Sequence, residues 1–408
     1  MRIAFITYEY PPDIAKGGIA TYVEQSAGLL QERGNNVEVF CGSYTRSVTE
    51  DNKGVLIHRC LIKDVTGFRE DCLNKFTERH ESVPFDIIES PEIHADALLI
   101  KKKFPSLPLV VKLHMASFIQ ARLLNFYTGK IAKLRYFMGG LRRGKINFYG
   151  AYNYLNDIEY TFTKLAEGIV APSQAQKKVI ADEWHLPAES ICVIPHSFSP
   201  PVKLLEIPVD VSVKKIVTFI GKLNVHKGIV NLVKVIPIVV KMHPEVVFRL
   251  IGSDSYFGAK KMNMSAFIRK ELRGFENNYT LPGSLEYEDV LKQFATTAVC
   301  IFPSLWECFG LVCLEAMSAG RAVVGSKEGG MNDILSNGAG MLVDPFNVKQ
   351  MAAAVIRLLD DDKLRCQYGN AGRAKVLSTF NRNLIGEQME AYYHATIANA
   401  EKMTYTIE

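Results

Sequence analysis

Residues 298–316 read AVCIFPSLWECFGLVCLEA, and this stretch decides the fold. Its first five residues are apolar without alternation, which is typical of a parallel strand that is covered on both faces. A short loop follows, and after Gly310 the pattern becomes that of a helix. Strand, loop and helix in this order form the repeating unit of an α/β domain with a parallel sheet.

Short apolar runs of the same kind recur along both halves of the chain. In the first half they are 3–7, 37–41, 85–89, 109–114, 168–172 and 191–195. In the second half they are 216–220, 246–251, 298–302, 322–324 and 340–343. Helix-like stretches lie between or after them, at 20–33, 348–360, 363–379 and 384–402. The sequence therefore predicts an α/β protein with two doubly wound, Rossmann-like domains.

The stretch 197–213 contains Pro200, Pro201 and Pro208 and shows no period, so we place the domain boundary there. The expected domains are 1–200 and 201–383, with the helix at 384–402 packing back towards the first. Doubly wound sheets bind ligands at the carboxyl ends of their strands. We therefore expect the two domains to face each other across a cleft that carries the chemistry.

Composition excludes several classes of protein. Of 408 residues, 48% are hydrophobic and 22% charged, which excludes a disordered or collagen-like chain. The net charge of +5 fits an anionic ligand but is too small to indicate a nucleic-acid partner. The eight cysteines form no CxxC pair, and no signal-like or membrane-spanning run occurs. We expect reduced thiols and a cytoplasmic protein.

Two carboxylates, Glu307 and Glu315, lie eight residues apart around Gly310. If a helix begins near Gly310, Glu307 lies in the loop and Glu315 in the second helical turn. The free backbone amides at that helix N-terminus favour an anion such as a phosphate. The alternative is a capping carboxylate followed by a solvated helical glutamate.

This segment resembles the E-x7-E motif of the retaining glycosyltransferases of GT-B fold, family 4 (glycosyl transferases group 1). The resemblance extends over nearly the whole chain. It implies that Glu307 contacts the donor sugar and that Glu315 holds the ribose hydroxyls of the nucleotide. It also assigns the donor sugar and phosphates to the backbone of the residues that follow Glu307, which are Cys308, Phe309, Gly310, Leu311 and Val312.

Lys222 and Lys227 lie on a loop bounded by Gly221 and Gly228, directly after the first apolar run of the second half. Two lysines on such a loop can stabilise a pyrophosphate leaving group, whose negative charge grows as the glycosidic bond breaks. Family members usually carry arginine at the first position. A lysine there supplies a point charge instead of a bidentate fork. A solvated basic turn is the alternative interpretation.

Gly17 and Gly18 follow Lys16 between the first apolar run and a helix, where backbone can approach an anion closely. By itself this pattern is equally typical of a plain loop. The resemblance places such a loop near the donor phosphate and the acceptor.

His114 ends the run 109–114, at the edge of the predicted sheet where ligands bind. The resemblance implies that a histidine here contacts the donor sugar, and a satisfied core histidine is the alternative. His196 also ends a run, and we interpret it as structural. Glu89 and Glu92 end a further strand, where contact with the acceptor and a role at a helix start are equally open.

The segment 115–150 has seven Lys and Arg residues, interleaved aromatic residues and no Asp or Glu. Such composition suits an anionic membrane surface or a phosphate-bearing acceptor, and equally a basic helix that covers its own core. RNA is a weaker alternative, because no RNA-binding motif accompanies the charge.

The resemblance implies a retaining glycosyltransferase that uses a UDP- or GDP-sugar and acts on a glycan or lipid-linked acceptor in polysaccharide or glycoconjugate synthesis. We expect no cofactor and no required metal, because the only Asp-rich string, 360–362, falls at a predicted helix junction. A nucleotide-sugar epimerase of GT-B fold and a non-catalytic scaffold at a membrane surface remain alternatives. Any membrane contact of the cytoplasmic protein would be peripheral, at the inner face of the plasma membrane.

Overall fold

The computed structural model describes residues 1–14, 17–62, 64–146, 148–209 and 215–405. The chain forms two compact units. Unit 1 comprises Met1–Ala116, Asn153–Phe198 and Phe380–Glu408, and unit 2 comprises Ser117–Tyr152 and Ser199–Thr379. Near the expected boundary, the division falls between Phe198 and Ser199, whereas residues 210–213 of the stretch 197–213 lie outside the described residues.

Unit 1 is built on an eight-stranded sheet in the order β3-β4-β2-β1-β5-β6-β7-β8. The strands are β1 (Arg2–Thr7), β2 (Asn36–Ser43), β3 (Thr49–Asn52), β4 (Val55–Leu61), β5 (Ile87–Pro91), β6 (Leu109–Lys112), β7 (Gly168–Ala171) and β8 (Ile191–Val193). All neighbouring pairs are parallel except β3 with β4. The sheet is therefore doubly wound about β1, with β2 on one side and β5 on the other.

Strands β3 and β4 are not among the predicted runs, because His58 and Arg59 interrupt the apolar pattern of β4. Both side chains are nevertheless buried. His58 Nε2 lies 2.7 Å from Glu38 Oε2, and Arg59 Nε donates to Glu50 Oε1 at 2.7 Å. Partners from neighbouring strands thus make a polar strand compatible with the interior.

The helices of unit 1 are α1 (Gly18–Glu32), α2 (Val65–Ser82), α3 (Leu98–Lys103), α6 (Ile158–Thr163), α7 (Gln174–Trp184) and α16 (Arg382–Tyr405). Short 3-10 turns lie at Ile93–Ala95, Tyr154–Asn156 and Ala188–Ser190. Helix α16 contributes Ile385, Met389 and Tyr393 to the same apolar core as β1, β2 and α1. The last helix of the chain therefore belongs to the core of its first domain.

Unit 2 has a six-stranded parallel sheet in the order β13-β10-β9-β14-β15-β16. Its strands are β9 (Ile216–Ile220), β10 (Val247–Ile251), β13 (Tyr279–Gly283), β14 (Val299–Phe302), β15 (Ala322–Ser326) and β16 (Met341–Val343). A separate antiparallel pair is formed by β11 (Tyr256–Phe257) and β12 (Met262–Asn263).

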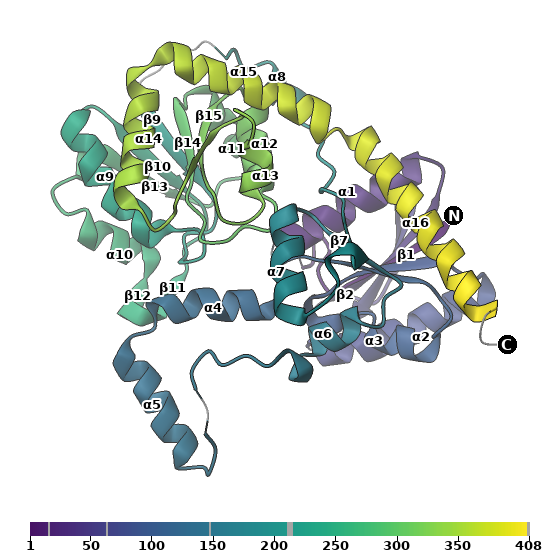
Figure 1. Ribbon diagram of the computed structural model, residues 1–408. Coiled ribbons are helices and arrows are strands. Elements are labelled where there is room, and N and C mark those ends of the chain that lie inside the picture. The colour runs from purple at the N-terminus through teal and green to yellow at the C-terminus, as the bar shows by residue number, and fades with distance from the viewer. Residues whose placement is uncertain (15–16, 63, 147, 210–214, 406–408) are drawn as a thin grey trace. The chain divides into compact units, whose positions relative to one another are not determined.

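The helices of unit 2 are α4 (Ser117–Tyr127), α5 (Lys130–Leu141), α8 (Val202–Leu205), α9 (Ile229–Met242), α10 (Met264–Glu271), α11 (Tyr287–Ala295), α12 (Leu311–Ser318), α13 (Met331–Leu335), α14 (Val348–Asp360) and α15 (Asp362–Thr379). Two further 3-10 turns are Gly258–Lys260 and Glu276–Asn278. Figure 1 shows α9 and α14 packed side by side on one face of the sheet, with α12 and α15 together on the other.

The expected strands are present in the structure, each within a few residues of its predicted ends. The predicted change from strand to helix in residues 298–316 is confirmed, because β14 ends at Phe302 and α12 begins at Leu311. In unit 2 the chain leaves β9 for β10 on one side and later returns to β14 on the other. The switch point of this sheet therefore lies between the carboxyl ends of β9 and β14, where doubly wound sheets bind ligands.

Candidate functional site

The loops that leave β9 and β14 meet at the switch point of unit 2. The amide of Leu305 donates to the carbonyl oxygen of His226 at 2.8 Å. Gly228 has φ +75°, and a Cβ atom there would lie 1.9 Å from the carbonyl oxygen of Pro303. Only glycine permits both this conformation and this approach. The sequence therefore brings the loop that carries Lys222 and Lys227, which we call the lysine loop, into direct backbone contact with the loop that carries Glu307.

Lys227 and Glu307 form an ion pair across these two loops. The lysine side chain is 30% exposed and the carboxylate 15%. Ser304 Oγ lies 3.4 Å from the same carboxylate oxygen, and the Lys227 amide donates to Asn224 Oδ1 at 2.9 Å. Both members of the pair are thus held at the carboxyl edge of the sheet while their charges remain accessible to a ligand.

The positive charge at this edge comes from two lysines. The pKa of His226 is lowered, first by burial and then by the charges of Lys227 and Lys222. Both lysines therefore lie close enough to His226 to affect its protonation, and the imidazole stays neutral at neutral pH. Lys222 itself is exposed. Together the two lysines place two positive charges at the switch point, and that of Lys227 is paired with Glu307.

The N-terminus of α12 also lies at the switch point, directly after the loop that carries Glu307. Gly310 precedes the helix with φ +117°, and the amide of Cys313 already bonds to the Gly310 carbonyl oxygen at 3.0 Å. The amides of Leu311 and Val312, in the first turn, have no partner within the helix. Such amides attract anions. The side chains of Cys308 and Phe309 are buried.

Two glycines that the sequence patterns do not indicate, Gly329 and Gly330, contact the backbone of this loop. The Gly330 amide donates to the carbonyl oxygen of Glu307 at 2.6 Å. A Cβ atom at Gly329 would lie 2.2 Å from the Glu307 carbonyl oxygen, and one at Gly330 would lie 2.4 Å from that of Cys308. The signal available in the sequence is a Gly-Gly pair in the loop that follows the strand run 322–324, just as Gly17 and Gly18 lie in the loop that follows the first run.

Glu315 lies in the second turn of α12, as predicted, and is partly buried. Its Oε1 accepts a hydrogen bond from the Tyr287 hydroxyl at 3.0 Å. Burial raises the pKa of Glu315 to about 7, while the bond from Tyr287 acts in the opposite direction. The structure thus adds Tyr287, at the start of α11, to the residues expected from the sequence.

Among the predicted residues of unit 1, Gly17 and Gly18 lie at the start of α1. Gly17 precedes the helix and Gly18 is its first residue. A Cβ atom at Gly18 would meet no heavy atom within 4 Å, so neither packing nor a positive φ requires glycine there. Lys16 of the same motif lies outside the described residues.

His114 lies just beyond β6 and is 6% exposed. Its amide donates to both carboxylate oxygens of Glu92 at 2.8 Å, and its ring packs edge-on against Tyr22 and stacks with His196. Burial, followed by the charge of Lys112, lowers the pKa of His114 to about 3. The imidazole is therefore neutral at physiological pH and is suited to hydrogen bonding rather than to donation of a proton from a charged ring.

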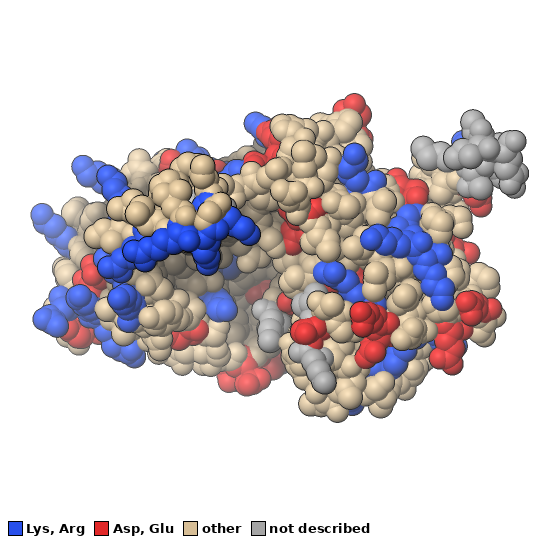
Figure 2. Space-filling view, turned by 90° about the horizontal axis from the view of Figure 1, so that it is seen from below, with Lys and Arg blue, Asp and Glu red and all other residues tan. Residues whose placement is uncertain are grey.

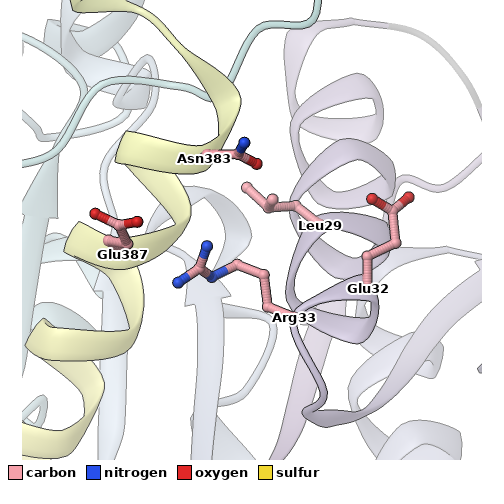
Figure 3. Close-up of a pocket in the computed structure, with 5 residues that line it drawn as sticks. All are labelled: Leu29, Glu32, Arg33, Asn383 and Glu387. Atoms are coloured by element: carbon pink, nitrogen blue, oxygen red, sulfur yellow. The ribbon is translucent and has the colours of Figure 1, made fainter.

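A separate recess of about 460 Å³ lies between α1 and α16 in unit 1. Figure 3 shows its lining side chains, which are Leu29, Glu32, Arg33, Asn383 and Glu387. It contains no residue predicted for the site. Within the described ranges, no group of three or more His, Cys, Asp and Glu residues is placed to hold a metal ion.

Two protein-family models match the chain. "Glycosyltransferase Family 4" matches residues 16–200, and "Glycosyl transferases group 1" matches residues 207–375. An uncharacterized glycosyltransferase of Methanocaldococcus jannaschii is 23% identical over 96% of this chain and 98% of its own length.

Solved structures show the same fold. A sucrose-phosphate synthase from Thermosynechococcus elongatus matches 98% of this chain and 99% of its own, with a TM-score of 0.73 at 20% identity. The Anabaena protein HepE in complex with UDP-glucose matches 97% of this chain and 100% of its own, with a TM-score of 0.67 at 18% identity. The predicted GT-B fold is confirmed.

Proposed function

This chain belongs to the glycosyltransferases of group 1, family 4, and on that premise we propose that it transfers a sugar with retention of anomeric configuration. The donor is a nucleotide-diphosphate sugar, as in the family. The acceptor in this proposal is a glycan or a lipid-linked oligosaccharide of a polysaccharide or glycoconjugate pathway.

The observation that carries the proposal is the Lys227–Glu307 pair beside the α12 N-terminus, at the switch point of unit 2. A diphosphate needs positive charge and amide donors, and a sugar needs a hydrogen-bonding carboxylate. These groups converge on one sheet edge. In the proposal, Lys222, Lys227 and the amides of Gly310, Leu311 and Val312 bind the diphosphate. Cys308 and Phe309 add backbone contacts.

The remaining assignments follow the family. Glu307 contacts the donor sugar, Glu315 accepts hydrogen bonds from the ribose hydroxyls, and Gly17 and Gly18 allow backbone to approach the donor phosphate. His114 supplies a neutral imidazole to a sugar hydroxyl. Its low pKa supports this role, because a neutral ring both donates and accepts a hydrogen bond.

We propose front-side attack for the chemical step. The bond from the sugar's anomeric carbon to the phosphate oxygen breaks, and the acceptor oxygen bonds to the same face of that carbon. The acceptor proton passes to the departing phosphate oxygen. The two lysines and the helix amides stabilise the charge that develops on this phosphate. They take the part that a divalent ion plays elsewhere, so the proposed reaction requires no metal.

Thermal unfolding with UDP, GDP or ADP, each in EDTA, tests the donor site. One nucleotide is expected to raise the midpoint by several degrees, because ligand at about a hundred times its dissociation constant adds about 2.7 kcal/mol. The same sugar-nucleotide class should then support transfer that EDTA does not reduce. A stabilising nucleotide that requires Mg²⁺ would contradict metal independence, and no shift with any nucleotide would contradict the donor site.

A second proposal concerns the described residues 126–146 and 148, which we call the basic hairpin. Here α5 and its flanks expose large apolar side chains, which are Phe126, Ile131, Leu134, Leu141, Ile146 and Phe148. Arg142, Arg143 and Lys145 are exposed beside them. Figure 2 shows Lys and Arg side chains gathered over the part of the surface where α5 lies. In the described residues, no helix is both long enough and apolar enough to cross a bilayer.

We propose that the basic hairpin binds the surface of an anionic membrane. Basic side chains beside exposed apolar ones are typical of interfacial helices, since the charges meet lipid headgroups while the apolar groups enter the boundary. Such binding would bring the enzyme to a lipid-linked acceptor at the inner face of the plasma membrane.

Reversing the three charges of Arg142, Arg143 and Lys145 to glutamate is expected to abolish co-sedimentation with vesicles that contain anionic lipid. Each basic residue near such a surface contributes about 1 kcal/mol. The matched control reverses three exposed lysines elsewhere in unit 2, which are Lys234, Lys349 and Lys363. Equal loss in both triple variants would mean that net charge alone governs binding and would refute a role for the hairpin.

A further inference from the structure

Tyr287 and Glu315 form a side-chain pair that the proposed mechanism does not use. The Tyr287 hydroxyl donates to Glu315 Oε1 at 3.0 Å. Oε2 of the same carboxylate makes no hydrogen bond within the described residues. Tyr287 is the first residue of α11, whereas Glu315 lies on α12, so the bond joins two separate elements of unit 2.

A single glutamate on a helix can rotate about its side-chain torsions, and the Tyr287 bond removes this freedom. The bond to Oε1 thus restrains the orientation of the carboxylate and leaves Oε2 able to accept from a ligand. Tyr287 itself is 52% exposed. Its hydroxyl is held by the bond to Glu315, while part of the residue faces solvent.

We propose that Tyr287 is a positioning residue for the donor, holding the Glu315 carboxylate in the orientation that receives the ribose hydroxyls. The inference rests on the proposed function, because it presupposes that Glu315 binds the ribose. It extends that function by adding a residue from α11 and by making donor affinity depend on one hydrogen bond within the protein.

The protonation of Glu315 gives this role a measurable signature. Its pKa of about 7 places the titration of this carboxyl within the pH range in which binding can be measured. The carboxylate accepts from the ribose hydroxyls, so donor binding strengthens as pH rises through 7. The Tyr287 bond stabilises the carboxylate and lowers the pKa of Glu315. Without this bond, the pKa is higher and binding requires a higher pH.

Several charged groups on the neighbouring elements have partners of their own. On α11, Glu288 pairs with Lys203 of α8. On α15, Arg373 Nε donates to the Ser318 carbonyl oxygen at 2.8 Å, and Lys375 Nζ donates to that of Asp333 at 2.8 Å.

The loop before α12 holds Glu307 against Lys227, and β15 carries no ionisable side chain. The pKa of Glu315 reflects burial and, after it, the hydrogen bond from Tyr287, and none of the charged groups just described is among its causes.

The test measures binding of nucleotide sugars by calorimetry from pH 5.5 to 8.5, without acceptor. Nucleotide sugars have no terminal phosphate that titrates in this range. Tyr287→Phe is expected to weaken binding about three- to tenfold at pH 7. It is also expected to move the midpoint of the pH dependence upward by about half a unit or more. Tyr256→Phe is the matched control, because Tyr256 is an exposed tyrosine of unit 2 whose hydroxyl makes no hydrogen bond within the described residues.

Glu315→Gln separates this inference from the function on which it rests. If Glu315→Gln leaves both affinity and the pH profile unchanged, Glu315 does not bind the ribose and the donor-site assignment fails. If it weakens binding and removes the titration near pH 7 while Tyr287→Phe matches the Tyr256→Phe control, only the positioning role is overturned. Thermal unfolding of each variant without ligand confirms that it is folded.

Discussion

Alanine at Gly329 or at Gly330 is expected to lower turnover by about 100-fold or more, although neither residue bears a functional group. Both glycines contact the backbone of the loop that carries Glu307. A Cβ atom at Gly329 would lie 2.2 Å from the Glu307 carbonyl oxygen, and one at Gly330 would lie 2.4 Å from that of Cys308. Since backbone cannot yield as a flexible side chain does, the loop must shift. A displacement of about 1 Å in a positioning element costs about 100-fold in rate.

Gly338→Ala provides the control, because it isolates the effect of backbone conformation. Gly338 has φ +78°, nearly the same as the +79° of Gly329, yet a Cβ atom there would meet no heavy atom within 4 Å. Its substitution is expected to cost about 1–2 kcal/mol of stability and little activity. Gly330 has φ −66°, so Gly330→Ala isolates the steric clash.

The measurement is kcat and KM of the three variants beside their thermal unfolding midpoints. Full activity in Gly330→Ala would show that the loop tolerates the displacement and that these glycines do not position Glu307. Equal loss in Gly329→Ala and Gly338→Ala would assign the effect to the positive φ alone.

The sequence predicted the parts of the fold that depend on local pattern. Strands such as β9 and β14 are continuous apolar runs, and Gly310 ends the loop before α12 where the pattern changes period. The lysine loop and the carboxylate motif were predictable as strand-end features. Their contact follows from the sheet order, in which β9 and β14 are neighbours.

Features that depend on distant partners were not predictable. Strand β4 was missed because the burial of Arg59 depends on Glu50, a residue on another strand. Tyr287 opens an ordinary amphipathic helix, and nothing in its local sequence indicates a bond to Glu315. Residues 117–152 follow a strand of the first domain, but the structure groups them with unit 2, where Phe126 packs against Phe346 and Tyr127 against Phe257.

Lys227→Met and Glu307→Gln are expected to lower turnover by about 10²–10³-fold each, but to change nucleotide binding in different ways. In the proposed mechanism Lys227 stabilises charge that grows on the leaving phosphate, and removal of one such preorganised group costs about this much. Without Lys227, the Glu307 carboxylate, which is only 15% exposed, faces the incoming diphosphate unpaired. Repulsion is then expected to weaken nucleotide binding by at least about tenfold.

Under the proposed assignment, Glu307→Gln acts on the contact with the donor sugar rather than on the diphosphate. The glutamine keeps the shape of the side chain but releases Lys227, whose charge becomes fully available to the phosphates. Nucleotide binding should therefore be unchanged or tighter, while transfer falls because the contact with the donor sugar and the fixed position of Lys227 are lost. Lys292→Met is the control, since Lys292 belongs to an exposed ion pair with Asp289 in the same unit.

The double variant completes the argument, because the two effects on binding have opposite origins. If the Lys227→Met defect includes repulsion by an unpaired Glu307, adding Glu307→Gln must recover part of the nucleotide affinity without recovering turnover. Calorimetric binding of UDP or GDP to the wild type, both single variants and the double variant forms a closed cycle that measures this coupling. Strictly additive binding effects would mean that the pair does not act as a unit. The diphosphate would then bind away from Glu307. The Glu307 carboxylate would influence the charge on the phosphates neither directly nor through Lys227.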